Sequence, residues 1–516
     1  YDGWLLSGGD LSQHYIGWKF FRHSSWHFPI GMIDGLVYPQ QTCIIFTDSV
    51  PLFALFFKLL SPILPDTFQY FGLWGAMTFF LMGAVSSVIL RKATKNPVLC
   101  VVGSIFFSCS PYVFQRMFGH TALAGNWLIL LAIAIWIYKP YFCTFKRKTL
   151  AWTALLVTAS LVHIYYIPMI MIFMFFSCVQ DLIEMRQWKM DIIMGILAIV
   201  VDLTVLGCVG AFSSTTAMED GGLGSYSANL NVFWNPIDKA RFLPTRPLIN
   251  PGQDEGFGYL GFGILILLAA AIVLSFLYFI YKWYKGLGKR KKRIQDYSFV
   301  ISMLLAITAS IILAASPTIS FNDRILKIIN YPNFIMKILS IFRASGRFIW
   351  CASYIFMFFA VMTVISKIKN RFIAFGCLFF CMGLQIMDLD PLMKSRHSLT
   401  QIHSERQVLH EEQWENVLVG KKHIVFLSYH HVFLNQGSDP VYEFANMAID
   451  HDLTINYCVI ARVDLEQVAE DERRLIGNLQ SGNYDNDTVY ILDSVETGEQ
   501  YHMNIQTIDG YVVGTY

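Results

Sequence analysis

Long apolar runs recur along the first three quarters of the chain, separated by short connections rich in Lys and Arg. Most runs approach the length that an α-helix needs to cross a bilayer. They predict ten membrane spans, at residues 67–90, 97–115, 121–138, 150–163, 164–180, 191–212, 259–283, 297–316, 346–366 and 371–387. A further span is expected upstream of residue 1, because the first apolar run begins only near residue 49.

The pattern differs before and after these spans. Residues 1–48 are aromatic and polar, and 49–62 are apolar but too short to span and contain Lys58, so an interfacial helix is predicted there. After residue 390 short apolar runs alternate with amphipathic segments, which predicts a small α/β layer with a partly parallel sheet. Its expected strands and helices are 423–428, 439–451, 455–460, 464–479 and 488–493.

The predicted fold class is therefore a polytopic α-helical membrane protein with a C-terminal soluble α/β domain. Its expected parts are an external loop with the interfacial helix (1–66), the transmembrane helical domain (67–390) and the extracytoplasmic α/β domain (391–516).

Composition and charge agree with this division. The chain is 55% hydrophobic and 15% charged, which a soluble globule would not need. Residues 391–516 hold 8 basic and 19 acidic side chains, so the remaining residues hold 31 basic and 18 acidic ones. Basic connections mark the cytoplasmic side of a plasma membrane. The longer polar loops and the acidic tail then fall outside, and nucleic-acid binding is not expected.

A polar cluster stands near the start of the chain. Asp10, Gln13 and His14 are spaced so that they share one face of a helix. One interpretation is a capping box, with Asp10 as N-cap and Gln13 at the third position. The alternative is a functional cluster of a carboxylate, an amide and an imidazole.

Other chemically capable groups fall in the loops assigned to the same outer face. Asp48 is the middle residue of Thr-Asp-Ser, which lies shortly before Pro51. His120 ends the stretch Arg-Met-Phe-Gly-His, which begins at Arg116. His163 lies at the turn between two short spans. Ordinary caps, interfacial imidazoles and solvated loops are the alternatives for these groups. Glu255 and Tyr259 belong to Asp-Glu-Gly-Phe-Gly-Tyr, a pattern that suits metal or sugar binding but also a plain loop.

Arg343 and Arg347 lie four residues apart at the outer end of the span 346–366. They could extend to the lipid headgroups, but a guanidinium pair is also a natural clamp for phosphate. Asp202 lies inside an apolar run, and we assign it no role.

Together these groups suggest transfer of a sugar from a lipid-linked phosphate. One carboxylate would act as general base toward an acceptor hydroxyl. Arginines would stabilise the departing phosphate. This design needs one base and a cationic clamp, unlike the two carboxylates of a glycoside hydrolase.

Four stretches carry a resemblance to a known family: GGDLSQHYIGWKFFRHSSWHFP, YPQQTCIIFTDSVPLFALFFKLLSPILPDTFQYFGLW, FQRMFGHTALAGNW and DEGFGYLGFG. Over residues 1–390 the chain resembles a bacterial family of polytopic proteins that is similar to the GT-C superfamily of membrane glycosyltransferases. The resemblance implies a polyprenyl-phosphate sugar donor and an acidic catalytic residue in the first outer loop, which is Asp10 here. Many GT-C enzymes have paired acidic residues there, whereas Leu11 follows Asp10.

The leading hypothesis is thus an inverting glycosyltransferase of a bacterial plasma membrane, acting on a cell-envelope glycan or lipid at the outer face. Its expected catalytic residues are Asp10, His14 and His120, with Arg343 and Arg347 on the donor phosphate. Gln13, Asp48, His163, Glu255 and Tyr259 are expected to bind substrate. No cofactor is assigned, and a divalent metal stays open. The alternatives are a transporter or flippase of a lipid-linked precursor, or a scaffold whose acidic tail binds a partner.

Overall fold

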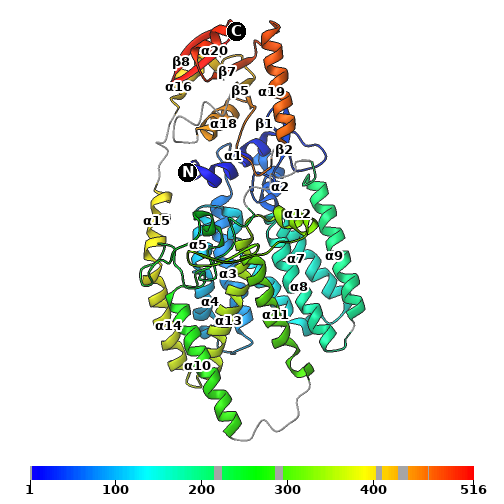
Figure 1. Ribbon diagram of the computed structural model, residues 1–516, viewed down its shortest axis with the longest axis vertical. Helices are drawn as coiled ribbons and strands as arrows, with labels where there is room; N and C mark the ends of the chain where they lie inside the picture. The colour runs from blue at the N-terminus through cyan, green and yellow to red at the C-terminus, as the bar shows by residue number, and fades with distance from the viewer. Residues whose placement is uncertain are drawn as a thin grey trace.

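The computed structural model describes residues 3–186, 188–213, 223–284, 294–401, 409–427, 440–462 and 464–516. A bundle of long helices forms most of the molecule, and the C-terminal domain covers one end of it (Figure 1). The bundle helices are α3 (Phe71–Leu90), α4 (Pro97–Ser108), α5 (Pro111–Met117), α6 (Trp127–Ile137), α7 (Phe145–Val162), α8 (Tyr166–Ile183), α9 (Trp188–Val209), α10 (Phe262–Tyr284), α11 (Ser298–Ala315), α13 (Ile349–Lys367) and α14 (Arg371–Asp388).

Seven helices in the described part of the chain are long and apolar enough to cross a membrane, and the bent pair α4–α5 would make an eighth. The central helix is α13: 83% of its apolar stretch is buried inside the protein. For α10 the buried share is 22%. Such apolar side chains on the outside of a bundle suit contact with lipid. The chain is therefore a multi-pass membrane protein, as its hydrophobic pattern predicts.

Each of the ten predicted spans coincides with a helix, but not every helix is a simple crossing. The run 97–115 is broken into α4 and α5, which meet at an angle of 52° before Pro111. The run 121–138 contains the 11-residue α6. The run 150–163 is the end of α7, whose first turn holds Lys146, Arg147 and Lys148. These two helices fall short of a full apolar span by length or by charge.

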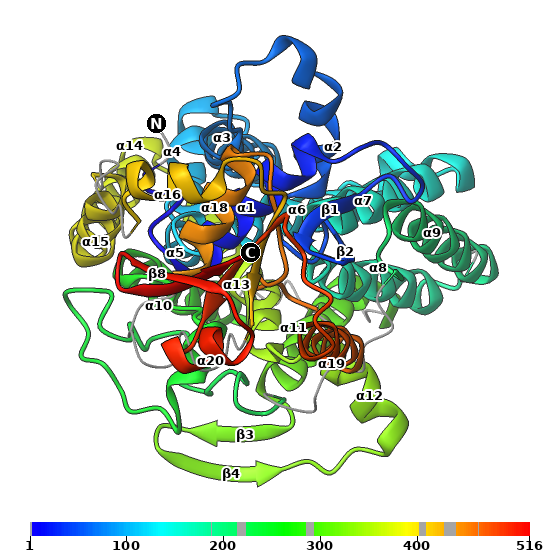
Figure 2. The same ribbon diagram turned by 90° about the horizontal axis from the view of Figure 1, so that it is seen from above.

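Most of the shorter elements before and between the long helices gather at the end of the bundle that faces the C-terminal domain (Figures 1 and 2). The predicted interfacial helix corresponds to the nine-residue α2. The set comprises α1 (Gly9–His23), β1 (Met32–Val37), β2 (Gln40–Cys43), α2 (Pro51–Leu59), the 3₁₀ turns η2 (Thr121–Ala124), η4 (Pro251–Gly256) and η6 (Ser345–Phe348), the hairpin of β3 (Thr318–Phe321) and β4 (Arg324–Ile328), and α12 (Asn333–Ile341).

The C-terminal domain is a five-stranded mixed sheet with helices, which confirms the predicted α/β class. The strand order is β6-β5-β7-β9-β8; β5 pairs in parallel with β6 and β7, and β9 is antiparallel to both of its neighbours. Its elements, after the connecting helix α15 (Asp390–Thr400), are α16 (Glu411–Leu418), β5 (His423–Phe426), α18 (Val441–Asp450), β6 (Thr454–Ile455), α19 (Leu465–Gln480), β7 (Thr488–Leu492), α20 (Val495–Gln500), β8 (Asn504–Ile508) and β9 (Tyr511–Thr515). The pair β8–β9 was not predicted.

Backbone hydrogen bonds join this domain to the segment that precedes the helical bundle. The amide of Tyr38 donates to Ile455 O at 2.9 Å, and the amide of Ala461 donates to Phe46 O at 2.8 Å. Lys19 on α1 also donates to Asn446 Oδ1 on α18 at 2.8 Å. The domain is thereby held directly above the end of the bundle (Figure 2).

Candidate functional site

A cavity of about 320 Å³ lies between the elements at this end of the bundle and the segment 459–462 of the C-terminal domain. Eight of the ten residues proposed from sequence line it, although they come from distant parts of the chain. These eight are Asp10, Gln13, Asp48, His120, His163, Glu255, Arg343 and Arg347.

Asp48 stands between two imidazoles. Its Oδ1 lies 3.3 Å from Nε2 of His163, and its Oδ2 lies 3.4 Å from Nε2 of His120. The Nδ1 of His163 accepts a hydrogen bond from the amide of Tyr165 at 3.2 Å. A neutral imidazole has one donor and one acceptor nitrogen, so His163 carries its proton on Nε2 and donates it to Asp48.

His14 extends the same cluster, although its ring does not line the cavity. Its ring centroid lies 4.8 Å from that of His120, and its Nδ1 is 2.7 Å from the hydroxyl of Thr121. The pKa of His14 is lowered to about 3 and that of His120 to about 4, in both cases mainly by burial. Burial also holds the pKa of His163 well below its usual value. All three rings are therefore neutral near pH 7.

A tight turn presents Asp48 to these rings. Asp48 has a φ of 54° and Val50 a φ of 51°, both in the left-handed region. The Ser49 hydroxyl donates to the carbonyl of His14 at 2.7 Å, which fastens the turn to α1. A Cβ at Gly17 would lie 2.3 Å from Cβ of Thr47, so only glycine lets α1 approach this closely.

Glu255 forms the centre of an ion-pair network on the opposite wall. Its Oε2 accepts from Nη2 of Arg116 at 3.0 Å, and from Nη2 of Arg347 at 2.7 Å. The side chains of both arginines are buried, with 7% and 10% of their surface exposed. The neighbouring guanidinium groups overcome the effect of burial and hold the pKa of Glu255 well below its usual value. Glu255 is thus ionised and paired within the protein.

Two glycines bring this network together. A Cβ at Gly346 would lie 2.7 Å from Cα of Gly256, so the backbones of η4 and η6 touch at these residues. Glu255 and Arg347 are their immediate neighbours in sequence. The predicted Arg343–Arg347 pair is therefore divided, since Arg347 is committed to Glu255 and stacks on Tyr165, with Cζ 4.5 Å from the ring centroid.

Two other arginines at the cavity, Arg343 and Arg462, form no ion pair with a described carboxylate. Arg343 is exposed and lies 5.8 Å from the ring centroid of Tyr226. Arg462 comes from the C-terminal domain and lies 5.7 Å from the ring centroid of Phe46. Within the described ranges, no carboxylate forms an ion pair with either side chain. Arg462 was not predicted, because nothing in its local sequence connects it with segments 400 residues away.

Asp10 is in the first turn of α1, with an exposed side chain at the cavity. The capping-box interpretation is wrong, because the N-cap is Gly8, and its amide donates to the Ser12 hydroxyl at 2.9 Å. Among the residues that the structure describes, no hydrogen bond or ion pair engages the Asp10 carboxylate. Gln13 donates from Nε2 to Phe46 O at 3.4 Å, which fixes the adjoining wall.

Tyr259 lies outside the cavity, contrary to the prediction. It is fully buried, and its hydroxyl donates to Asp388 Oδ2 at 2.7 Å. It therefore joins the start of α10 to the end of α14. Asp202 is also buried, within α9, away from this cavity.

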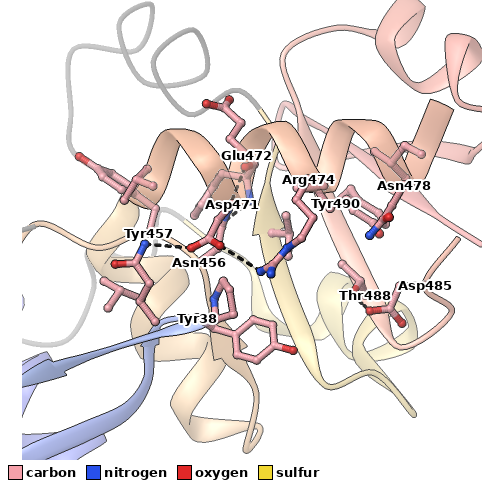
Figure 3. Close-up of a pocket in the computed structure, with 18 of the residues that line it drawn as sticks. Tyr38, Asn456, Tyr457, Asp471, Glu472, Arg474, Asn478, Asp485, Thr488 and Tyr490 are labelled. Atoms are coloured by element: carbon pink, nitrogen blue, oxygen red, sulfur yellow. Dashed lines mark hydrogen bonds and ion pairs between the residues drawn. The ribbon is translucent and has the colours of Figure 1, made fainter. Parts of the chain in front are cut away.

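A second cavity, of about 230 Å³, lies between the tip of the β1–β2 hairpin and the C-terminal domain (Figure 3). Its polar groups bond to one another: Asp471 accepts from Gln40 at 3.0 Å and from Arg474 at 3.0 Å. Figure 3 shows these contacts crossing the pocket beside Tyr38. Among the described residues that line it there is no histidine, so the chemically richer of the two sites is the larger cavity.

One group of side chains in the described part of the chain has the composition of a metal site. His14, Asp48 and His120 each offer a ligand atom, and these atoms lie within 4.8 Å of one another. The arrangement as a whole can thus supply a free carboxylate, neutral imidazoles and unpaired cations to a single cavity.

Comparison with known proteins identifies the family. The model of a domain of unknown function, DUF6311, matches residues 1–390, and that of the DUF6311 C-terminal domain matches residues 413–516. No curated protein and no solved structure gives a significant match. The chain therefore belongs to the DUF6311 family, with a polytopic helical region followed by that family's C-terminal domain.

Proposed function

We propose that this protein is an inverting glycosyltransferase that moves a sugar from a polyprenyl-phosphate donor to a cell-envelope acceptor, at the outer face of a bacterial plasma membrane. The observation that carries the proposal is the single cavity lined by the free carboxylate of Asp10 and the unpaired guanidinium groups of Arg343 and Arg462. Its volume is within the range of sites for small molecules.

Each charged group has a distinct part in the proposed reaction. The acceptor oxygen attacks the anomeric carbon, and Asp10 takes the hydroxyl proton. The bond from that carbon to the phosphate oxygen breaks, and the electron pair leaves with the phosphate. Arg343 and Arg462 stabilise this anion. A single displacement inverts the anomeric centre.

Contacts within the site separate Asp10 from the other carboxylates. Asp48 accepts from His163 and faces His120, and Glu255 is paired with Arg116 and Arg347. Both are already engaged, so Asp10 is the carboxylate best able to accept a proton. Arg347 supports the cavity wall and is replaced by Arg462 in the phosphate clamp, which revises the sequence-based assignment.

Asp10→Asn tests this proposal. Transfer of radiolabelled sugar from polyprenyl-phosphate donors should fall by about 10²–10⁴-fold, with the melting temperature unchanged because the side chain is exposed. Asp66→Asn, which changes an exposed carboxylate outside the cavity, is the matched control. Wild-type transfer by Asp10→Asn would remove Asp10 as the base. Donor flux in proteoliposomes without any glycosylated product would support the flippase alternative.

A further inference from the structure

The cluster of His14, Asp48 and His120 contains buried ring nitrogens without hydrogen-bond partners. His14 uses Nδ1 toward Thr121, and its Nε2 is buried with no partner among the described residues. The Nδ1 of His120 is in the same condition. A buried polar atom without a partner destabilises the folded state. His120 faces Oδ2 of Asp48 through its other nitrogen, Nε2. The unpartnered Nε2 of His14, in a cluster that also offers a carboxylate and a second imidazole, therefore points to an absent binding partner.

We infer that His14, Asp48 and His120 bind one divalent first-row transition-metal ion at the floor of the larger cavity. Their ligand atoms, one from each residue, lie within 4.8 Å of one another. That separation needs only small side-chain movements to reach metal–ligand distances near 2.0–2.2 Å. The inference concerns ion binding and does not depend on the proposed transferase activity.

Surrounding hydrogen bonds hold the ligands in suitable orientations. The Thr121 hydroxyl fixes Nδ1 of His14 and leaves Nε2 as the ligand atom. His163 donates to Oδ1 of Asp48, so Oδ2 stays directed toward His120. Metal-binding imidazoles and carboxylates are usually oriented in this way by a second group.

The donor set selects the class of ion. Two neutral imidazoles and one carboxylate suit Zn²⁺ and similar transition metals, whereas Mg²⁺ and Ca²⁺ prefer oxygen ligands throughout. Asp48 and His120 also line the cavity, so further coordination positions face it. Three protein ligands with an open position are the pattern of a catalytic rather than a structural metal site.

Metal analysis of the purified full chain in detergent tests the inference. After treatment with EDTA and exposure to Zn²⁺, the wild type should retain one ion per chain. Calorimetric titration should show much tighter binding of Zn²⁺ than of Mg²⁺. X-ray absorption at the zinc edge should show imidazole ligands, a result that needs no variant. A chain that binds no stoichiometric Zn²⁺, or zinc without imidazole ligands, would overturn the inference.

Variants then assign the ligands. Asp48→Asn keeps a residue type that tolerates the left-handed turn, and His120→Asn shortens a second ligand. Each should weaken Zn²⁺ binding by at least about 10–100-fold, the loss found even for outer partners. His23→Gln, on the exposed end of α1, should bind as the wild type does. Unchanged affinity in both ligand variants, with their folding checked by melting temperature, would refute the assignment.

Discussion

Nε2 of His163 lies 3.3 Å from Oδ1 of Asp48, while Nδ1 of the same ring accepts from a backbone amide. The ring is thus fixed at both nitrogens, and its proton is directed at the carboxylate. His163 does not itself complete the group of three potential ligands. It is a positioning residue that acts through Asp48.

We expect His163→Ala to weaken Zn²⁺ binding by about 10–100-fold, because Asp48 loses the donor that orients it. His163→Gln, which can still donate an N–H group, should recover part of the affinity. Isothermal titration measures both. Equal affinity in wild type and His163→Ala would show that Asp48 needs no such support.

Glu255→Gln should destabilise the protein by about 3–5 kcal/mol, since it leaves Arg116 and Arg347 buried without a counter-charge. Thermal unfolding in detergent measures the change. The adjacent Asp254→Asn is the control: it breaks a more exposed pair with Lys239 and should cost about 0–1 kcal/mol. Equal effects would mean that the network carries no special stability.

The destabilisation caused by Glu255→Gln should depend on pH. Folding lowers the pKa of Glu255 below its usual 4.5, so the ionised carboxylate stabilises the folded state above that pH. The contribution is lost as the pH falls through the folded-state pKa. The difference in melting temperature between wild type and Glu255→Gln should therefore be largest near pH 7 and shrink below about pH 4.5. A difference independent of pH would contradict this account.

Arg462→Ala should raise the KM for a polyprenyl-phosphate donor by about 10–100-fold, because a charge-assisted hydrogen bond contributes about 1.5–3 kcal/mol. Arg343→Ala should have a comparable effect, and the double variant a larger one. Arg473→Ala, on the exposed side of α19, serves as the control. A normal donor KM in Arg462→Ala would exclude the C-terminal domain from phosphate binding.

Gly17→Ala should reduce both Zn²⁺ binding and sugar transfer, because the new Cβ would collide with Thr47 and displace the Asp48 turn. Alanine is otherwise favoured over glycine within a helix by about 1 kcal/mol, so any loss must come from the contact. Gly72→Ala, where no atom lies within 4 Å of the added Cβ, should leave both properties unchanged.

The hydrophobic pattern was sufficient to predict the helical bundle, because long apolar runs have few other stable conformations in lipid. It did not predict where helices break, as at the bend before Pro111. The expected strand 455–460 ends after Ile455, where the Asn456 side chain bonds both the amide and the carbonyl of Phe426. This side-chain contact replaces the backbone hydrogen bonds of a β-ladder. It leaves no periodic pattern of apolar and polar residues in the sequence.

Residue type and the assignment of the polar loops to one face were enough to select eight side chains that share one cavity. Which of these side chains form ion pairs with one another could not be predicted from the sequence. Glu255 and Arg347 are 92 positions apart, and only the contact of Gly256 with Gly346 makes them partners. The assignment of Tyr259 to the site was wrong because one loop motif has two roles. Its Glu255 lines the cavity, whereas its Tyr259 packs against Asp388.

The hydrogen bond from the amide of Ala461 to the carbonyl of Phe46 joins two segments that the whole helical bundle separates in sequence. The cavity wall at 459–462 is consequently completed only after the bundle helices α3 to α14 have been translated. A nascent or truncated chain ending at residue 390 would lack this wall of the cavity.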